Sequence, residues 1–258
     1  MESSFQIVGK GMTIPCKQNL PEAGSVRRVV LGVHGLGGSM EDDIQRSIAD
    51  EMPLFGSAVV RFDLPAHGCN PTESEGFTVA GCTDTLLAVA EDALRRFPEV
   101  EDLCVFATGF GAYITLNALE RLTLLPCRIR LVVQTPSVLM HETLLSMMRM
   151  SRETFWALDS YTFRVKRPFT VNYAFYEELA SNIVLSPQPI PMLILMGQED
   201  AYIRAADIQN FRRINEDARL VILPGISHRF LEEGAWDMVL DLTRDWFEFE
   251  QVLVTDWE

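Results

Sequence analysis

The sequence contains no run of about 18 consecutive apolar residues, which is the length that a helix needs to cross a membrane. Its first residues, Met1 to Gln6, also lack the basic start and the apolar core of a secretory signal. We therefore expect neither a membrane-spanning helix nor a cleaved export signal in this chain.

Cysteine is scarce, and its spacing indicates free thiols rather than a disulfide framework. There are five cysteines, an odd number, and no C-x-x-C motif occurs. This pattern is typical of a reducing compartment, so we predict a cytoplasmic location. The four histidines show no H-x-x-x-H or H-E-x-x-H spacing, so no metal site is expected, and no cofactor is expected either.

Basic residues are outnumbered by acidic ones. Lys and Arg total 22 against 36 Asp and Glu, which gives a net charge of −14. Nucleic acids and anionic membranes repel a surface of this sign, so neither is expected as a partner. An acidic surface also keeps a protein in solution, and this is the simplest interpretation of the charge.

Apolar residues, by contrast, are plentiful and are arranged in short runs that alternate with helical patterns. The chain has 258 residues and is 48% hydrophobic, enough for one sizeable domain with a packed core. Most of the apolar runs are continuous, as in strands that are buried on both faces of a parallel sheet. This alternation predicts an α/β fold with a doubly wound, mainly parallel sheet. The predicted strands cover 27–33, 57–62, 103–107, 129–134, 191–196 and 218–223, after an N-terminal hairpin at 4–17, and the predicted helices cover 41–52, 78–97, 110–123, 205–215 and 230–250.

Residues 137–190 interrupt this alternation of strands and helices. They separate two predicted strands by a long segment with helical patterns of its own, rich in methionine and aromatic residues. A long insertion at the ligand-binding edge of the sheet predicts a helical cap, with residues 1–136 and 191–258 forming the core. The methionines would then either line an adaptable apolar site or simply pack the cap onto the sheet.

Four loops at predicted strand ends carry the residues that are most informative about function. In such sheets, ligands bind at the carboxyl ends of the strands. The loops occur in the order His34-Gly-Leu-Gly-Gly, Ala107-Thr-Gly-Phe-Gly, Gly197-Gln-Glu-Asp200 and Gly225-Ile-Ser-His228. In this order and at these positions, they resemble the α/β-hydrolase superfamily over essentially the whole chain, and more specifically its serine esterases and thioesterases.

The resemblance implies a role for each of these loops. In the family, a nucleophile stands in the middle of a G-x-S-x-G turn between a strand and a helix, and Gly109 occupies that position here. By resemblance, His228 is the general base and Asp200 the acid that orients it. The oxyanion hole would be formed by the backbone N–H groups of Leu36 and Phe110. His34 is expected to brace its loop rather than transfer protons.

Gly109 has no side chain and therefore cannot attack a substrate. A glycine relieves the backbone strain of this turn but deletes the nucleophile, so the chain as written is expected to be inactive or nearly so. Either the natural protein has lost its nucleophile, or the sequence is a variant whose natural form carries serine. Other routes remain open, namely a water activated by His228 or a side chain from the set Thr108, Ser39, Ser137, Ser227 and Cys69.

Two further functions remain as alternatives. The first is a non-catalytic protein that binds or senses a small molecule in the same site. The second is an interaction protein that works through its acidic surface and has an occluded pocket. The hydrolase and binding interpretations both predict a small apolar or acyl-bearing substrate or ligand under the cap.

Overall fold

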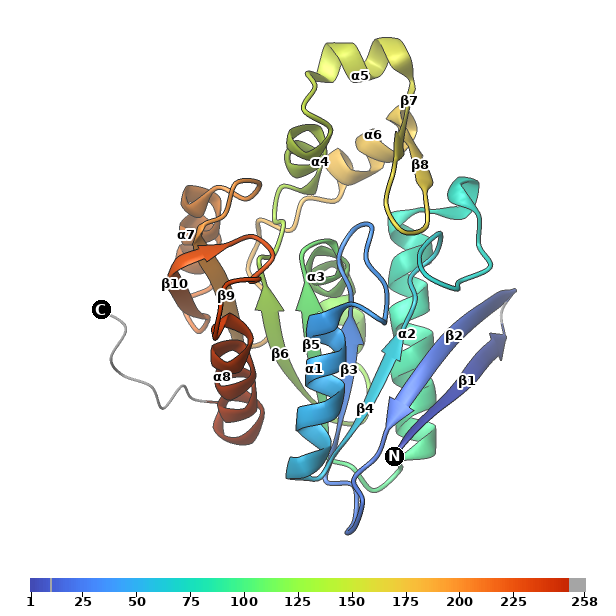
Figure 1. Cartoon of the computed structure of the whole chain (residues 1–258), viewed down its shortest axis with the longest axis vertical. Helices are drawn as coiled ribbons and strands as arrows, with labels where there is room; N and C mark the ends of the chain where they lie inside the picture. Colours follow the sequence, from blue (N-terminus) through green and yellow to red (C-terminus); the bar gives the residue numbers. More distant parts are fainter. Residues whose placement is uncertain (10, 251–258) are drawn as a thin grey trace.

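A computed structural model of the chain describes residues 1–9 and 11–250, and an eight-stranded sheet forms its centre (Figure 1). The strands of this sheet are β1 (Glu2–Gly9), β2 (Met12–Asn19), β3 (Arg28–Val33), β4 (Ser57–Phe62), β5 (Asp102–Thr108), β6 (Arg128–Gln134), β9 (Met192–Glu199) and β10 (Arg219–Ser227). Their order is β1-β2-β4-β3-β5-β6-β9-β10. The predicted N-terminal hairpin is present as β1 and β2, which pair antiparallel, although Lys10 in its turn lies outside the described residues. The strands from β4 to β10 are parallel, so the prediction of a mainly parallel sheet is confirmed.

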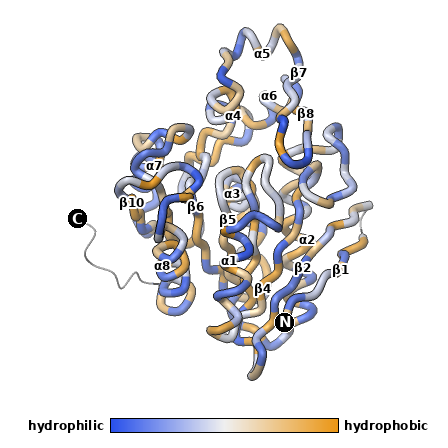
Figure 2. The backbone as a smooth tube through the Cα atoms, in the orientation of Figure 1, coloured by the Kyte–Doolittle hydropathy of each residue, from blue (hydrophilic) through white to orange (hydrophobic). Residues whose placement is uncertain are grey.

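Successive residues of the central strands belong to two different hydrophobic cores, one on each face of the sheet. On β3, Val29 and Leu31 belong to one hydrophobic cluster, whereas Val30 between them belongs to the other. Side chains alternate across a strand, so a strand that is apolar at every position must be covered on both faces. Figure 2 shows the apolar stretches along the central strands.

The helices cover both faces of the sheet. They are α1 (Asp43–Glu51), α2 (Val79–Arg96), α3 (Phe110–Leu122), α7 (Ala205–Ile214) and α8 (Ala235–Phe249), with short 3-10 helices at η1 (Met52–Phe55) and η2 (Ser74–Gly76). The buried residues of α1 and α8 share one cluster, and those of α2, α3 and α7 share the other (Figure 1). The doubly wound arrangement is therefore confirmed.

The last helix begins later than the sequence predicts. We expected it to start near Phe230, but α8 starts at Ala235. Phe230 has a φ of 54° and Gly234 has a φ of 75°, and both values are incompatible with a right-handed helix. The residues between Ser227 and Gly234 form turns instead, and His228 lies in this non-helical segment.

The insertion, residues 137–190, contains more than helices. It comprises α4 (Met140–Met148), α5 (Arg152–Leu158), β7 (Ser160–Phe163), β8 (Phe169–Asn172) and α6 (Tyr173–Ser181). β7 and β8 pair antiparallel in a separate two-stranded sheet, which the sequence analysis did not predict. Figure 1 shows the insertion beyond the carboxyl ends of the parallel strands. Its apolar residues join the cluster on the α2 and α3 side of the main sheet.

None of the helices within residues 1–9 and 11–250 is long and apolar enough to cross a membrane.

Candidate active site

The turn between β5 and α3 holds Gly109 in a conformation that suits glycine. Gly109 has a φ of 50° and a ψ of −112°, which lies outside the regions that L-residues ordinarily occupy. Its N–H donates to the carbonyl of Gln134 on β6, at 2.9 Å, so the neighbouring strand helps to fix the turn. Helix α3 begins immediately afterwards at Phe110. The sequence analysis placed a strand–turn–helix junction at this position, and the structure has one.

The two glycines of this turn have different neighbours. A Cβ atom added at Gly111 would lie 2.4 Å from the carbonyl oxygen of His34, so Gly111 lets α3 approach the end of β3. A Cβ added at Gly109 would meet only the Cα of Gly35, at 3.9 Å. Position 109 therefore has room for a side chain, although its backbone geometry disfavours one.

Asp200 and His228 follow the adjacent strands β9 and β10 and are in direct contact. Asp200 Oδ2 lies 2.7 Å from His228 Nδ1. A β-bulge in β10 precedes Ser227, which pairs with Glu199, and this brings the next residue beside Asp200. At Gly197 an added Cβ would lie 2.3 Å from the carbonyl oxygen of Ile226, so this close crossing of the two strands requires glycine.

The Asp200 carboxylate is completely buried and fully hydrogen-bonded. Its side chain is 0% exposed, and its Oδ1 accepts from the N–H groups of Tyr202 at 2.8 Å and Ile203 at 2.9 Å. These donors satisfy the hydrogen-bonding capacity of a carboxylate oxygen that is buried. Because a carboxylate only accepts, the proton of the neutral His228 imidazole lies on Nδ1, and Nε2 is left as the basic atom. The Tyr202 ring packs edge-on against the imidazole, with centroids 5.1 Å apart.

Two backbone N–H groups flank the Gly109 turn. Phe110 is the first residue of α3, where N–H groups have no partner inside the helix and the helix dipole favours negative charge. Leu36 follows Gly35, whose Cα is the nearest neighbour of the Gly109 side-chain position. In the described part of the chain, no acceptor takes up either N–H group. Both groups therefore remain available to a negatively charged oxygen.

Two buried histidines hold the loops around the turn together. His34 Nε2 accepts from the N–H of Leu64 at 3.0 Å, so its Nδ1 carries the proton and donates to the Gly35 carbonyl at 2.9 Å. His67 is arranged in the same way, accepting from Gly37 at 2.9 Å and donating to Pro65 at 2.8 Å. Burial lowers the pKa of His67 to about 3, and the neighbouring His34 adds to this effect. The expectation that His34 braces its loop agrees with these contacts.

Aromatic side chains from the core and the insertion pack together beside Phe110. Phe77 contacts Phe110, Phe169 and Phe175 with ring centroids 4.7–5.7 Å apart, and His67 contacts both Phe77 and Phe169. Phe110, Phe77 and Phe169 are almost completely buried. This aromatic cluster joins the first residue of α3 to β8 and α6, so the insertion lies directly against the Gly109 turn.

The insertion is fastened to the core by Arg167, in the turn between β7 and β8. Its guanidinium donates to four backbone carbonyls of the loop 67–72, at 3.3 Å for His67 and Gly68 and 3.1 Å for Thr72, with Asn70 as the fourth acceptor. Glu178 on α6 adds a second attachment, because its carboxylate accepts from the N–H of Val79 at the start of α2. Charged contacts thus fix both ends of the β8–α6 segment.

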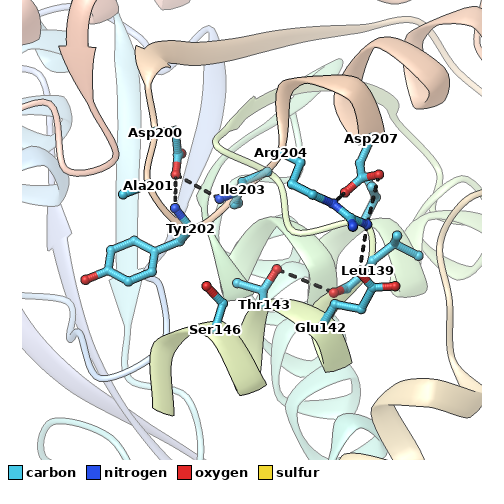
Figure 3. A pocket seen from close by; sticks show the side chains of 11 residues that line it. Leu139, Glu142, Thr143, Ser146, Asp200, Ala201, Tyr202, Ile203, Arg204 and Asp207 are labelled. Atoms are coloured by element: carbon cyan, nitrogen blue, oxygen red, sulfur yellow. Dashed lines mark hydrogen bonds and ion pairs between the residues drawn. The ribbon is translucent and has the colours of Figure 1, made fainter. Parts of the chain in front are cut away.

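Two pockets border the insertion. The first, of about 250 Å³, lies between α4 and the segment Asp200–Asp207, and Tyr202 lines it (Figure 3). The second, of about 500 Å³, lies between η2, the start of α2, β8 and α6, and Phe77 and Phe175 line it. Gly109, Phe110 and His228 line neither of them. The sequence analysis expected ligand space under the cap, and both of these pockets border the insertion without having Gly109 in their lining.

Two of the side chains considered as substitute nucleophiles, Ser137 and Ser39, are engaged in other hydrogen bonds. Ser137 is buried and donates to Thr143 at 2.6 Å, and the Ser39 hydroxyl accepts from the N–H of Glu41. Cys69 is exposed. Among the described residues, only Asp200 hydrogen-bonds to the His228 ring. Residues 1–9 and 11–250 also contain no group of three His, Cys, Asp or Glu side chains placed to hold a metal ion.

Sequence reasoning missed several residues that shape this site. His67 and Tyr202 had no recognisable spacing, and Arg167 was one of several scattered charges in the insertion. The loop 63–68 gave a weak indication that it borders the site, because it follows a buried strand and is rich in turn-forming residues. The structure shows why this loop is compact: the Asp63 carboxylate accepts from the N–H groups of Met40 and Cys69.

Comparison with known proteins gives a consistent result for the fold. A model of the alpha/beta hydrolase family matches residues 30–242. A search of curated proteins finds no match in sequence. Among solved structures, Est1E from Butyrivibrio proteoclasticus, determined with ferulic acid bound, has a TM-score of 0.81 at 17% identity, and the match covers 97% of this chain and 100% of that one.

Two other solved structures show the same likeness. A protein from Agrobacterium vitis S4 has a TM-score of 0.81 at 19% identity, with 96% of this chain and 99% of that one covered. The mouse alpha/beta hydrolase domain-containing protein 10 has a TM-score of 0.76 at 15% identity, with coverage of 96% and 100%. At such identities the structures establish a common fold.

Proposed function

Because the chain belongs to the alpha/beta hydrolase family, we propose that its site is that of a carboxylic ester or thioester hydrolase whose nucleophile position is occupied by Gly109. The observation that carries this proposal is the contact between Asp200 Oδ2 and His228 Nδ1 at 2.7 Å, with the Asp200 side chain 0% exposed. A buried carboxylate that orients an imidazole and leaves its Nε2 free is the arrangement that acyl transfer needs.

With a serine at position 109, each residue would have a defined part in the reaction. The serine Oγ attacks the carbonyl carbon of the ester while His228 Nε2 takes its proton. The N–H groups of Leu36 and Phe110 stabilise the negative oxygen of the tetrahedral intermediate. His228 then passes the proton to the departing alcohol, and a water molecule releases the acyl group by the same steps. One ester and one water give one carboxylic acid and one alcohol.

With glycine at this position, the attack has no nucleophile. Loss of one member of a catalytic triad lowers the rate by several orders of magnitude, so the chain as written has little or no esterase activity. The acid, the base and the two N–H groups do not depend on the side chain at position 109. Their retention favours a recent or deliberate loss of serine over a site that has long been without catalytic use.

The binding alternative is favoured by a different observation. Two N–H groups without acceptors beside an open position would hold a carboxylate, and the aromatic cluster would pack against an apolar or aromatic remainder. This ligand resembles the acid product of the hydrolase reaction. The two proposals therefore use the same residues and differ in turnover.

An assay of Gly109→Ser with short-chain aryl esters separates them. We expect hydrolysis by Gly109→Ser and none by the starting chain, and the matched control Gly109→Ala should also be inactive. Adding His228→Ala to Gly109→Ser should abolish the gain. If Gly109→Ser hydrolyses no ester while an aryl carboxylate raises the melting temperature of the starting chain, the hydrolase proposal is wrong and the binding proposal holds.

We also infer that the insertion, residues 137–190, serves as a cap and that the protein works in the cytoplasm without nucleic-acid or membrane partners. The shared aromatic cluster and the Arg167 contacts support the first inference. The free thiols of the five cysteines and the net charge of −14 support the second. Its ligand would be a small apolar or acyl-bearing molecule.

A further inference from the structure

The order of the strands predicts that the two ends of a bound ester lie on different sides of the Gly109 turn. Leu36 follows β3, which neighbours β5 on one side, whereas β6, β9 and β10 lie on the other side. A negative oxygen held by the N–H groups of Leu36 and Phe110 therefore points toward β3. The alcohol, which takes its proton from His228, must leave toward β6 and β9.

The 250 Å³ pocket lies on this departing side. Its walls come from the segment that follows β6, from Val138 to Ser146, and from the segment that follows β9, from Asp200 to Asp207. Tyr202 lines the pocket and also packs against the His228 imidazole at 5.1 Å. Tyr202 therefore connects the pocket to the proposed base.

The wall formed by α4 is polar. Glu142, Thr143 and Ser146 are spaced by one to four residues and lie on one face of the helix, and Figure 3 shows this face turned toward the 200–204 loop. The Ser146 hydroxyl has no hydrogen-bond partner within the described residues. Glu142 Oε2 pairs with Arg204 at 2.7 Å, while its Oε1 lies 4.0 Å from His141 and keeps its acceptor capacity.

The charged groups of the pocket disfavour an anion. Arg204 is held by two carboxylates, because it also pairs with Asp207 at 2.7 Å. With Asp200, the pocket lining contains three carboxylates against a single guanidinium, and the protein as a whole carries −14. The pocket volume of about 250 Å³ is large enough for several water-sized groups. An uncharged group with several hydroxyls matches this size and this pattern of donors and acceptors.

We propose that the pocket between α4 and the 200–207 segment binds the alcohol portion of the ester, and that it selects a small polyol over an apolar or anionic alcohol. This inference rests on the proposed hydrolase function. Ser146 donates to one polyol oxygen, and Glu142 accepts from another hydroxyl. The acyl portion lies on the opposite side, against the aromatic cluster.

The test uses the full chain with Gly109→Ser and three butyrate esters that share a three-carbon alcohol skeleton. These are propyl butyrate, glyceryl monobutyrate and the butyrate ester of 3-hydroxypropanoate. Each kcat/KM is divided by the rate constant for hydrolysis of the same ester by hydroxide, which removes differences in intrinsic reactivity. We expect the glyceryl ester to exceed the propyl ester by about tenfold, the effect of one or two hydrogen bonds, and the anionic ester to rank last.

Two variants in the Gly109→Ser background identify the residues responsible. Ser146→Ala should lower kcat/KM for the glyceryl ester about fivefold and leave the propyl ester unchanged, because one donor is lost. Glu142→Gln should bring the normalised kcat/KM of the anionic ester closer to that of the propyl ester. Ser160→Ala is the matched control, since Ser160 is an exposed serine of β7 outside the pocket, and it should change none of the ratios.

The outcomes distinguish this inference from the function on which it rests. If Gly109→Ser hydrolyses aryl esters but treats the glyceryl and propyl esters alike, the pocket assignment is wrong and the hydrolase proposal stands. The same holds if Ser146→Ala lowers both esters equally. If Gly109→Ser hydrolyses no ester, the proposed function itself fails and the pocket assignment fails with it.

Discussion

The conformation of Gly109 makes a quantitative prediction for Gly109→Ala. Its φ of 50° and ψ of −112° lie where an L-residue is strained, at a cost of about 1–3 kcal/mol. No steric clash adds to this cost, because the new Cβ would meet only the Cα of Gly35 at 3.9 Å. Alanine also restricts the unfolded chain, which offsets about 0.4–1 kcal/mol. We therefore expect the free energy of unfolding to fall by about 1–2 kcal/mol.

Gly111→Ala provides the comparison, because its cost has a different origin. The added Cβ would lie 2.4 Å from the carbonyl oxygen of His34 and 2.6 Å from that of Val33, and neither backbone atom can move without shifting β3. This overpacking should cost about 3 kcal/mol or more. Gly111→Ala should therefore be clearly less stable than Gly109→Ala, although the two glycines are only two residues apart.

Urea unfolding followed by circular dichroism measures both values, and the melting temperature should fall by about 2–4 °C for each kcal/mol in a domain of this size. The reasoning is refuted if Gly109→Ala is as stable as the starting chain, since the turn would then carry no strain. It is also refuted if Gly109→Ala loses more stability than Gly111→Ala. Either result would mean that the backbone of the turn differs from the one described.

Two further predictions concern the loops around the site. The pKa of His67 is lowered by burial to about 3, so the unfolded chain takes up its proton near pH 6.5 and the folded chain does not. The contribution of His67 to stability should therefore be fully present above pH 6.5 and fall by about 1.4 kcal/mol per unit below it, or roughly 2 kcal/mol by pH 5. His67→Gln should make the slope shallower, and equal slopes for both proteins in urea titrations would contradict the assignment. Arg167→Ala removes the donor to the carbonyls of the 67–72 loop, so limited proteolysis within 160–172 should become faster. The matched Lys166→Ala, at a neighbouring exposed position, should leave the rate of proteolysis unchanged. If Arg167→Ala is cleaved no faster than the starting chain, other contacts hold the insertion.

The fold could be predicted from the sequence because each strand and helix is indicated by the pattern of apolar residues within its own short segment. Continuous apolar runs such as 103–107 define strands that are buried on both faces, and the period of the 78–97 segment defines a helix. The start of α8 was placed too early because Phe230 takes a positive φ, which no periodic pattern reveals. The β7–β8 hairpin was missed because its strands are only four residues long.

The candidate site could be predicted only where residues follow strand ends in a recognisable order. Asp200 and His228 were singled out in this way, and the structure brings them into contact. His67 and Tyr202 could not be predicted from residue spacing, because each contacts a partner in a different loop. The aromatic cluster was equally hidden, because its members come from the residue after η2 and from α3, β8 and α6.

The contacts of Arg167 have a consequence for how this protein can change over generations. All of its acceptors in the 67–72 loop are main-chain carbonyls, which every amino acid supplies. Substitutions in that loop can therefore accumulate without removing a single acceptor, provided that the backbone keeps its path. The attachment is inherited through one arginine codon, and residues of the loop such as His67 and Gly68 are constrained by their own contacts rather than by Arg167.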